Sequence, residues 1–168
     1  VYFTVEELAD AADVFPIEFH QMANARVVLY GRDPFEFVEL SNANLRHQTE
    51  YELRSKLIQL RRLYIPASVS IDKLCDLMTD SLSSFAALFR AVLILHGQEA
   101  PVTKPDGVRA TATLLHLDPK PFERIFGFRS GGNLPTSEKE ANDLFGAYLF
   151  QIEQVVAAVD NLPMGDLR

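Results

Sequence analysis

From Asn42 onward, hydrophobic residues recur every three or four positions, which is the spacing of one face of an α-helix. This spacing predicts a first long helix from about Asn42 to Tyr64, and Pro66 is expected to end it. The residues expected on its apolar face are Leu45, Thr49, Leu53, Leu57, Leu60 and Tyr64.

The same spacing continues to the end of the chain. A second helix is expected from about Ser70 to Gly97, and its second half, residues 85–95, is apolar on nearly all sides, as in the central helix of a bundle. Further helices are expected after the capping signatures at Thr103 and Ser137, with a short one after Pro119. Long helices joined by short connections predict an antiparallel four-helix bundle over residues 41–168.

The first forty residues follow a different pattern. Thr4 and Glu7 form a capping box for a short helix, and two short runs, 14–19 and 26–30, are rich in aromatic and β-branched residues. Both runs are interpreted as strands, the first interrupted by Pro16 and the second ended by Gly31. The expected fold is therefore mostly α, with a short N-terminal αββ segment over residues 1–40 that remains from an α/β domain.

Composition narrows the class of protein. The chain of 168 residues is 48% hydrophobic and 23% charged, as globular proteins are, and its net charge of −7 argues against duplex nucleic acid as the main partner. A single cysteine, Cys75, cannot form an internal disulfide, which favours a reducing cytoplasm. The longest apolar stretch is too short to cross a bilayer, so no membrane partner is expected.

Several segments resemble bacterial nucleotidyltransferase-like proteins of the polymerase-β type. Residues 12–19, the segment Arg26-Val-Val-Leu-Tyr-Gly31, and the stretch 45–61 resemble a late strand, a turn and the first bundle helix of such proteins. Helix 141–162 is similar to their closing helix. The resemblance implies that this chain is the helical accessory or substrate-binding region, and that an upstream nucleotidyltransferase-like domain of the same protein binds a nucleotide and Mg²⁺. The absence of an initiator Met fits a piece trimmed from a longer protein.

The most specific motif of that family is absent here. Gly-Ser followed by an Asp-x-Asp pair holds the catalytic metal ions in the family, and Ser130-Gly131-Gly132 lies late in the chain with no such pair after it. Only Glu18, or with less support Asp13, matches the family's third carboxylate. One carboxylate cannot build a two-metal site, so the chain is expected to be inactive alone and to hold no metal itself.

Arg46, Glu50 and Arg54 are spaced by four residues and therefore share one line on the first long helix. The functional interpretation is a substrate-binding stripe whose arginine forks face a cleft and bind phosphate. The commoner alternative is a solvated helix face whose charges pair with one another. Both interpretations stay open from the sequence.

Two further functions compete with the accessory-region hypothesis. The first is a non-catalytic interaction bundle that forms a homodimer. The second is a HEPN-type ribonuclease, which the spacing of Arg90 and His96 resembles weakly, although six positions do not share a helix face. The remaining histidines, His20, His47 and His116, lack metal-ligand spacing, and no structural zinc is expected.

Overall fold

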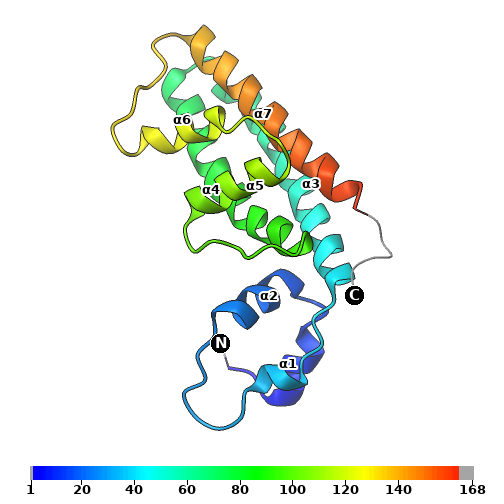
Figure 1. Ribbon diagram of the computed structural model, residues 1–168. Helices are drawn as coiled ribbons and strands as arrows, with labels where there is room; N and C mark the ends of the chain where they lie inside the picture. Colours follow the sequence, from blue (N-terminus) through cyan, green and yellow to red (C-terminus); the bar gives the residue numbers. More distant parts are fainter. Residues whose placement is uncertain (1, 163–168) are drawn as a thin grey trace.

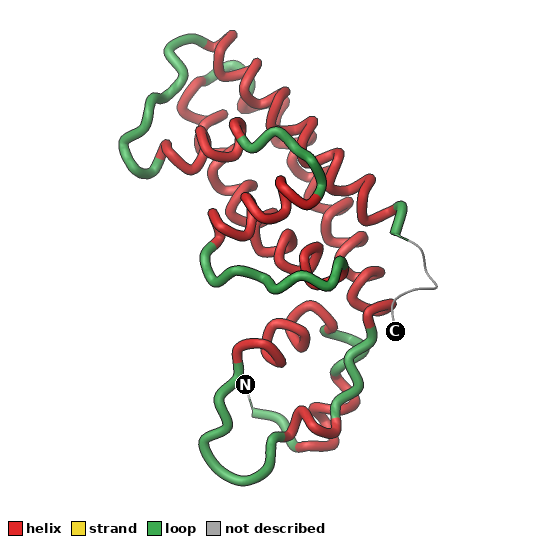
Figure 2. The backbone as a smooth tube through the Cα atoms, in the orientation of Figure 1, coloured by secondary structure: helices red, strands yellow, loops and turns green. Residues whose placement is uncertain are grey.

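The computed structural model describes residues 2–162, and every regular element within them is helical (Figures 1 and 2). The elements are α1 (Val5–Ala11), α2 (Pro16–Ala25), the 3₁₀ helix η1 (Pro34–Phe37), α3 (Asn42–Ala67), α4 (Ile71–Leu95), α5 (Lys104–Leu114), α6 (Lys120–Phe128) and α7 (Glu138–Asp160). The expectation of a mostly α chain is confirmed.

The predicted N-terminal αββ segment is wrong. Residues 14–19 lead into and begin α2, because Pro16 stands in the first turn, where its missing N–H is not needed and its fixed φ favours a helix. The buried residues of α2 have the spacing of one helix face; they are Pro16, Ile17, Phe19 and His20. Over so short a run, the alternation of Phe15, Ile17 and Phe19 looks the same as the alternation of a strand. Residues 26–30 form no regular element, with a bend at Tyr30, and the described chain offers no strand for them to pair with.

Most helix starts follow the capping signals. Thr4 and Glu7 form the expected capping box, with hydrogen bonds of 3.1 and 2.8 Å between side chains and backbone. Thr103 caps α5 through the Asp106 N–H. The predicted end of α3 is two to three residues early. Pro66 lies in the last turn, and the helix closes at Ser68, whose N–H donates to the Tyr64 carbonyl at 2.8 Å.

The bundle is organised around α4, which packs against α3, α5, α6 and α7. Its core contains an aromatic group in which the Phe122 ring meets Phe89 and Tyr148 edge-on, with both pairs of centroids 6.0 Å apart. The buried Tyr148 hydroxyl lies 3.0 Å from the Ser81 hydroxyl, and burial raises the pKa of Tyr148 well above its usual value. Burial in this core accounts for the apolar character of α4.

By length and composition alone, α4 also qualifies as a membrane-crossing helix, with a mean hydropathy of 1.4 over its most apolar window. Half of that window is buried inside the bundle. The core helix of a folded bundle passes the same test, so length and composition do not distinguish a membrane-crossing α4 from a core helix.

The N-terminal lobe, residues 2–40, lies at one end of the bundle, beside the start of α3 (Figure 1). It has a small core of its own, in which Leu8, Ala12 and Phe19 pack with Phe35, Val38 and Leu40. Ile17 joins the lobe to the bundle. Its side chain belongs to the main core, and its N–H donates to Gln48 Oε1 at 3.0 Å.

Candidate functional site

The charged line predicted on α3 is occupied by internal contacts. Arg54 Nε lies 2.9 Å from Glu50, and its Nη2 lies 2.8 Å from the Asp160 carboxylate at the end of α7. Arg46, which is buried, donates from Nη2 to the Asp160 carbonyl oxygen at 2.8 Å and lies 3.8 Å from Glu50. The arrangement ties the start of α3 to the end of α7, and Arg54 helps to hold the pKa of Asp160 below its usual value.

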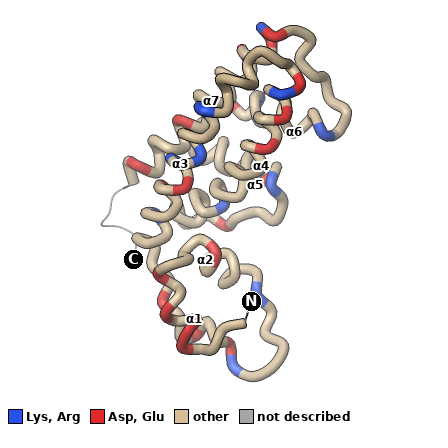
Figure 3. Tube along the Cα trace, turned by 180° about the vertical axis from the view of Figure 1, so that it is seen from behind, with Lys and Arg blue, Asp and Glu red and all other residues tan. Residues whose placement is uncertain are grey.

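Neighbouring turns repeat this pattern. Arg61 Nη2 lies 2.8 Å from Glu153, one step further along the α3–α7 contact. In the view from behind, basic and acidic residues are interspersed along the bundle (Figure 3). The self-paired alternative for the Arg46–Glu50–Arg54 line is therefore the one that the contacts favour.

Glu18 is not on a strand, because it occupies the first turn of α2 and is exposed there. A carboxylate in that position is stabilised by the helix dipole without any ligand. The described residues contain no group of three or more His, Cys, Asp or Glu side chains that could hold a metal ion. The lone thiol, Cys75, is buried, and burial, with Asp72 and Asp76 nearby, raises its pKa and disfavours the reactive thiolate.

Arg90 and His96, the ribonuclease candidates, do not share an environment. His96 caps the end of α4, with Nδ1 2.9 Å from the Val92 carbonyl oxygen. Arg90 lines a cavity between α4, α2 and the loop after α4, and His96 does not line it. Within this chain the two side chains are not brought together for acid–base chemistry.

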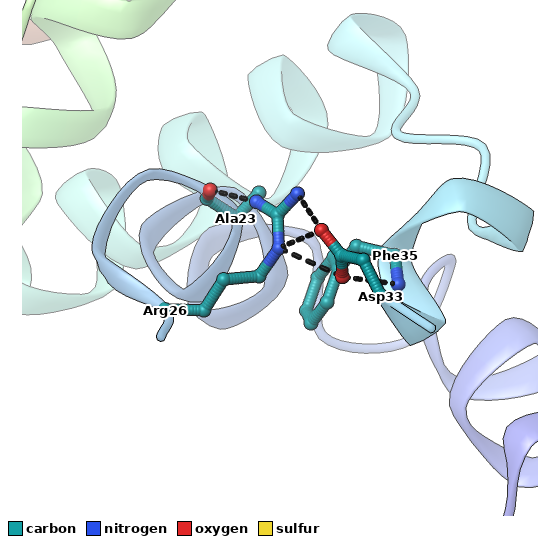
Figure 4. Close-up of polar contacts among 4 residues, drawn as sticks. All are labelled: Ala23, Arg26, Asp33 and Phe35. Carbon is teal, nitrogen blue, oxygen red and sulfur yellow. Dashed lines mark hydrogen bonds and ion pairs between the residues drawn. The ribbon is translucent and has the colours of Figure 1, made fainter. Parts of the chain in front are cut away.

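An ion pair between Arg26 and Asp33, called the clasp below, closes the loop after α2 and was not predicted from the sequence (Figure 4). Arg26 Nε and Nη2 lie 2.8 and 2.5 Å from Asp33 Oδ2, and the guanidinium also donates to the Ala23 carbonyl and stacks over Phe35, 4.9 Å from the ring centroid. The Arg26 hydrogen bonds, with a further one from the Phe35 N–H, lower the pKa of Asp33. The only sequence signal was the pairing of opposite charges seven residues apart.

The clasp holds out an apolar loop, Val27–Tyr30. The exposed fraction is 80% at Val27, 93% at Leu29 and 98% at Tyr30. More than half of the exposed large hydrophobic side chains in the described chain belong to the N-terminal lobe, which also includes Tyr2, Phe3, Val14, Phe15 and Phe37. This gathering of exposed apolar side chains on one small lobe makes the lobe the candidate interaction surface of the described chain.

The Glu140 carboxylate makes the contact between α6 and α7 dependent on pH. Glu140 accepts hydrogen bonds from the Thr136 N–H and hydroxyl and pairs with Arg124, and these contacts lower its pKa to about 2. Because the folded-state pKa is depressed, this stabilisation is complete above the unfolded value near 4.5 and is lost as the pH falls toward 2.

We therefore expect Glu140→Gln to remove part of the acid sensitivity of the fold. Urea unfolding midpoints measured from pH 7 to pH 2 are expected to converge for wild type and variant at the acid end and to differ at neutral pH. Glu138→Gln is the control, since Glu138 makes no side-chain ion pair among the described residues and its variant should follow the wild-type profile. Parallel curves for Glu140→Gln and wild type across the whole range would contradict the assignment.

Comparison of the chain with protein-family models, with curated proteins and with solved structures finds no match. Within the described residues, the most distinctive surface is the apolar loop Val27–Tyr30 of the N-terminal lobe, which the Arg26–Asp33 clasp closes.

Proposed function

We propose that this chain is the helical accessory region of a nucleotidyltransferase-like protein, and that its N-terminal lobe is the surface that contacts the nucleotidyltransferase-like domain. The observation that carries the proposal is the apolar surface of the lobe, with Val27–Tyr30 held out by the Arg26–Asp33 clasp. The bundle core is complete without that surface, so its hydrophobic side chains are available for another folded domain.

The resemblance supplies the identity of the partner domain, which is placed upstream in the same polypeptide. In this proposal the partner domain binds nucleotide and Mg²⁺, because the metal-binding motif is absent from this chain. The bundle acts as a support, and its α3–α7 ion pairs hold its shape.

The sharpest test changes Leu29 to aspartate in two contexts. Leu29 is 93% exposed, so the variant of this chain alone should keep its stability to within about 0.5 kcal/mol. In the polypeptide that also carries the nucleotidyltransferase-like domain, the same change buries a charge in the contact and should destabilise the fold by about 1–3 kcal/mol. Urea unfolding of both forms measures the difference.

Val69→Asp is the matched control, because Val69 is 72% exposed in the turn between α3 and α4, outside the lobe. It should be neutral in both contexts. Equal behaviour of the Leu29 and Val69 variants in the longer polypeptide would contradict docking through the lobe. Calorimetric titration of nucleoside triphosphate with Mg²⁺ completes the test, with binding expected only where the partner domain is present.

A second function, a self-associating interaction bundle, is favoured by one specific observation. Tyr51, Ile58 and Ile65 are exposed at seven-residue spacing along α3 and form one apolar stripe. The spacing is symmetric about Ile58, so two copies of α3 can cross antiparallel with Ile58 against Ile58 of the second copy. Sedimentation velocity of the chain alone separates the two functions, since a stable dimer favours this one and a monomer favours the accessory region.

A further inference from the structure

A partly open cavity of about 510 Å³ lies beside Arg90, between the N-terminal lobe and the bundle. It lies where three parts of the chain meet, with Gln21 and Asn24 from α2, Arg90 and Ile94 from α4, and the loop after α4. Gly97 begins that loop with a φ of +68°, and the Gln98 N–H donates back to the Leu93 carbonyl at 2.9 Å. This turn directs residues 97–102 along the cavity and makes them one of its walls.

Arg90 has a hydrogen-bond donor that no other described residue accepts from. Its stem packs beside Gly107 of α5, where a Cβ would lie 3.8 Å from Arg90 Cγ. Its Nε is buried and has no hydrogen-bond partner, and no described carboxylate lies within ion-pair distance of its guanidinium. A buried charged N–H without a partner is costly, and an anion in the cavity would remove that cost.

The two carboxamides that line the same cavity are also unused. Neither the Gln21 nor the Asn24 side chain makes a hydrogen bond to another described residue, and both belong to the α2 wall facing α4. One guanidinium fork and two amide donors suit an oxyanion with at least three acceptor oxygens. A planar carboxylate has two oxygens, and both are used by the guanidinium fork. A phosphate pairs with the fork in the same way and has further oxygens that accept from the two amides.

We propose that this cavity binds a phosphate group, with Arg90 as the bidentate ligand and Gln21 and Asn24 as supporting donors. The site is distinct from the lobe surface and does not rest on the proposed function. It joins α2 to α4, so a bound phosphate connects the N-terminal lobe to the bundle. Glu99 also lines the cavity but is exposed, and its carboxylate opposes the anion from the rim.

The test is titration of inorganic phosphate into the chain, followed by ³¹P NMR line broadening and by the melting temperature. Saturable binding and a rising melting temperature are expected, because a ligand that binds only the folded state stabilises it. Arg90→Gln should weaken binding at least tenfold, and Arg90→Lys should recover part of it because the charge remains without the fork. Arg62→Gln is the control, since Arg62 is exposed and has no ion pair among the described residues, and it should bind as wild type does.

Two more variants make the result decisive. Glu99→Gln should tighten binding by removing the opposing charge, and the Gln21→Ala/Asn24→Ala pair, outside the main core, should weaken it severalfold. If Arg90→Gln fails to fold, the phosphate affinity of the Gln21→Ala/Asn24→Ala variant is the deciding measurement. An affinity equal to that of wild type overturns the proposal. Equal affinity of wild type and a folded Arg90→Gln, or equal binding of acetate and phosphate, overturns it as well.

A third titration identifies the source of the phosphate. Adenosine monophosphate binding more tightly than inorganic phosphate, with the same dependence on Arg90, assigns a phosphomonoester ligand. Equal binding of the two assigns free phosphate. Adenosine monophosphate binding that does not depend on Arg90 overturns the assignment of the phosphate to this guanidinium.

Discussion

Phe122→Ala is expected to lower the free energy of unfolding by about 3–5 kcal/mol, the usual cost of removing a large buried aromatic ring. Phe122 is 1% exposed and stands between Phe89 and Tyr148, edge-on to both. Its loss removes buried apolar area and two aromatic contacts at once, and the long helices α4 and α7 on either side restrict collapse into the cavity. Urea denaturation followed by circular dichroism measures the change.

Phe150→Ala is the matched control for this prediction. Phe150 lies on α7, as Tyr148 does, but is 56% exposed, so its truncation should change stability by no more than about 0.5 kcal/mol. A small effect at Phe122, similar to that at Phe150, would mean that α6 is not a fixed part of the core.

The bundle was predictable because its signals are long and mutually consistent. Helix α3 repeats its apolar positions over most of its 26 residues, and Ser41, Ser70, Thr103 and Ser137 each accept a backbone hydrogen bond at a helix start. Over such lengths the period of 3.6 residues cannot be confused with the period of a strand. The error at Pro66 is local, since a proline in the last turn removes one hydrogen bond and leaves the helix free to close.

The N-terminal lobe was mispredicted because its segments are short. Phe15, Ile17 and Phe19 alternate like a strand, yet the same run with His20 also fits one helix face, and Pro16 in the first turn was the signal for the helix. Residues 26–30 have the composition of a strand, but a strand requires a partner, and composition does not supply one. The position of Glu18 changed with its element, so the candidate third carboxylate lost the geometry on which it depended.

The candidate site was harder to predict, because ion pairs depend on tertiary placement. The spacing of Arg46, Glu50 and Arg54 gave the common line correctly but could not show that Asp160, more than a hundred residues away, lies against it. Likewise, Arg90 and Gln21 meet across a cavity between helices that only the fold brings together. The sequence identified the charged side chains, and the fold decided which of them are already paired.

Arg46→Ala is the variant that tests this distinction, and it is expected to destabilise the fold by about 1–3 kcal/mol. The Arg46 guanidinium is largely buried and donates to the Asp160 carbonyl in the last turn of α7, so its removal takes away the donor that this helix-end carbonyl receives from α3. Arg54→Ala should cost less than Arg46→Ala, because the Arg54 side chain is 48% exposed and water replaces its ion pairs. Arg62→Ala should cost almost nothing, since Arg62 is exposed and has no ion pair among the described residues. Urea denaturation of the three variants measures the loss of stability, which is expected to be largest for Arg46→Ala, smaller for Arg54→Ala and smallest for Arg62→Ala.

If the Arg46–Glu50–Arg54 line on α3 is instead a substrate-binding stripe, Arg46→Ala keeps full stability and loses affinity for phosphate or nucleotide. That outcome would contradict the structural role of Arg46.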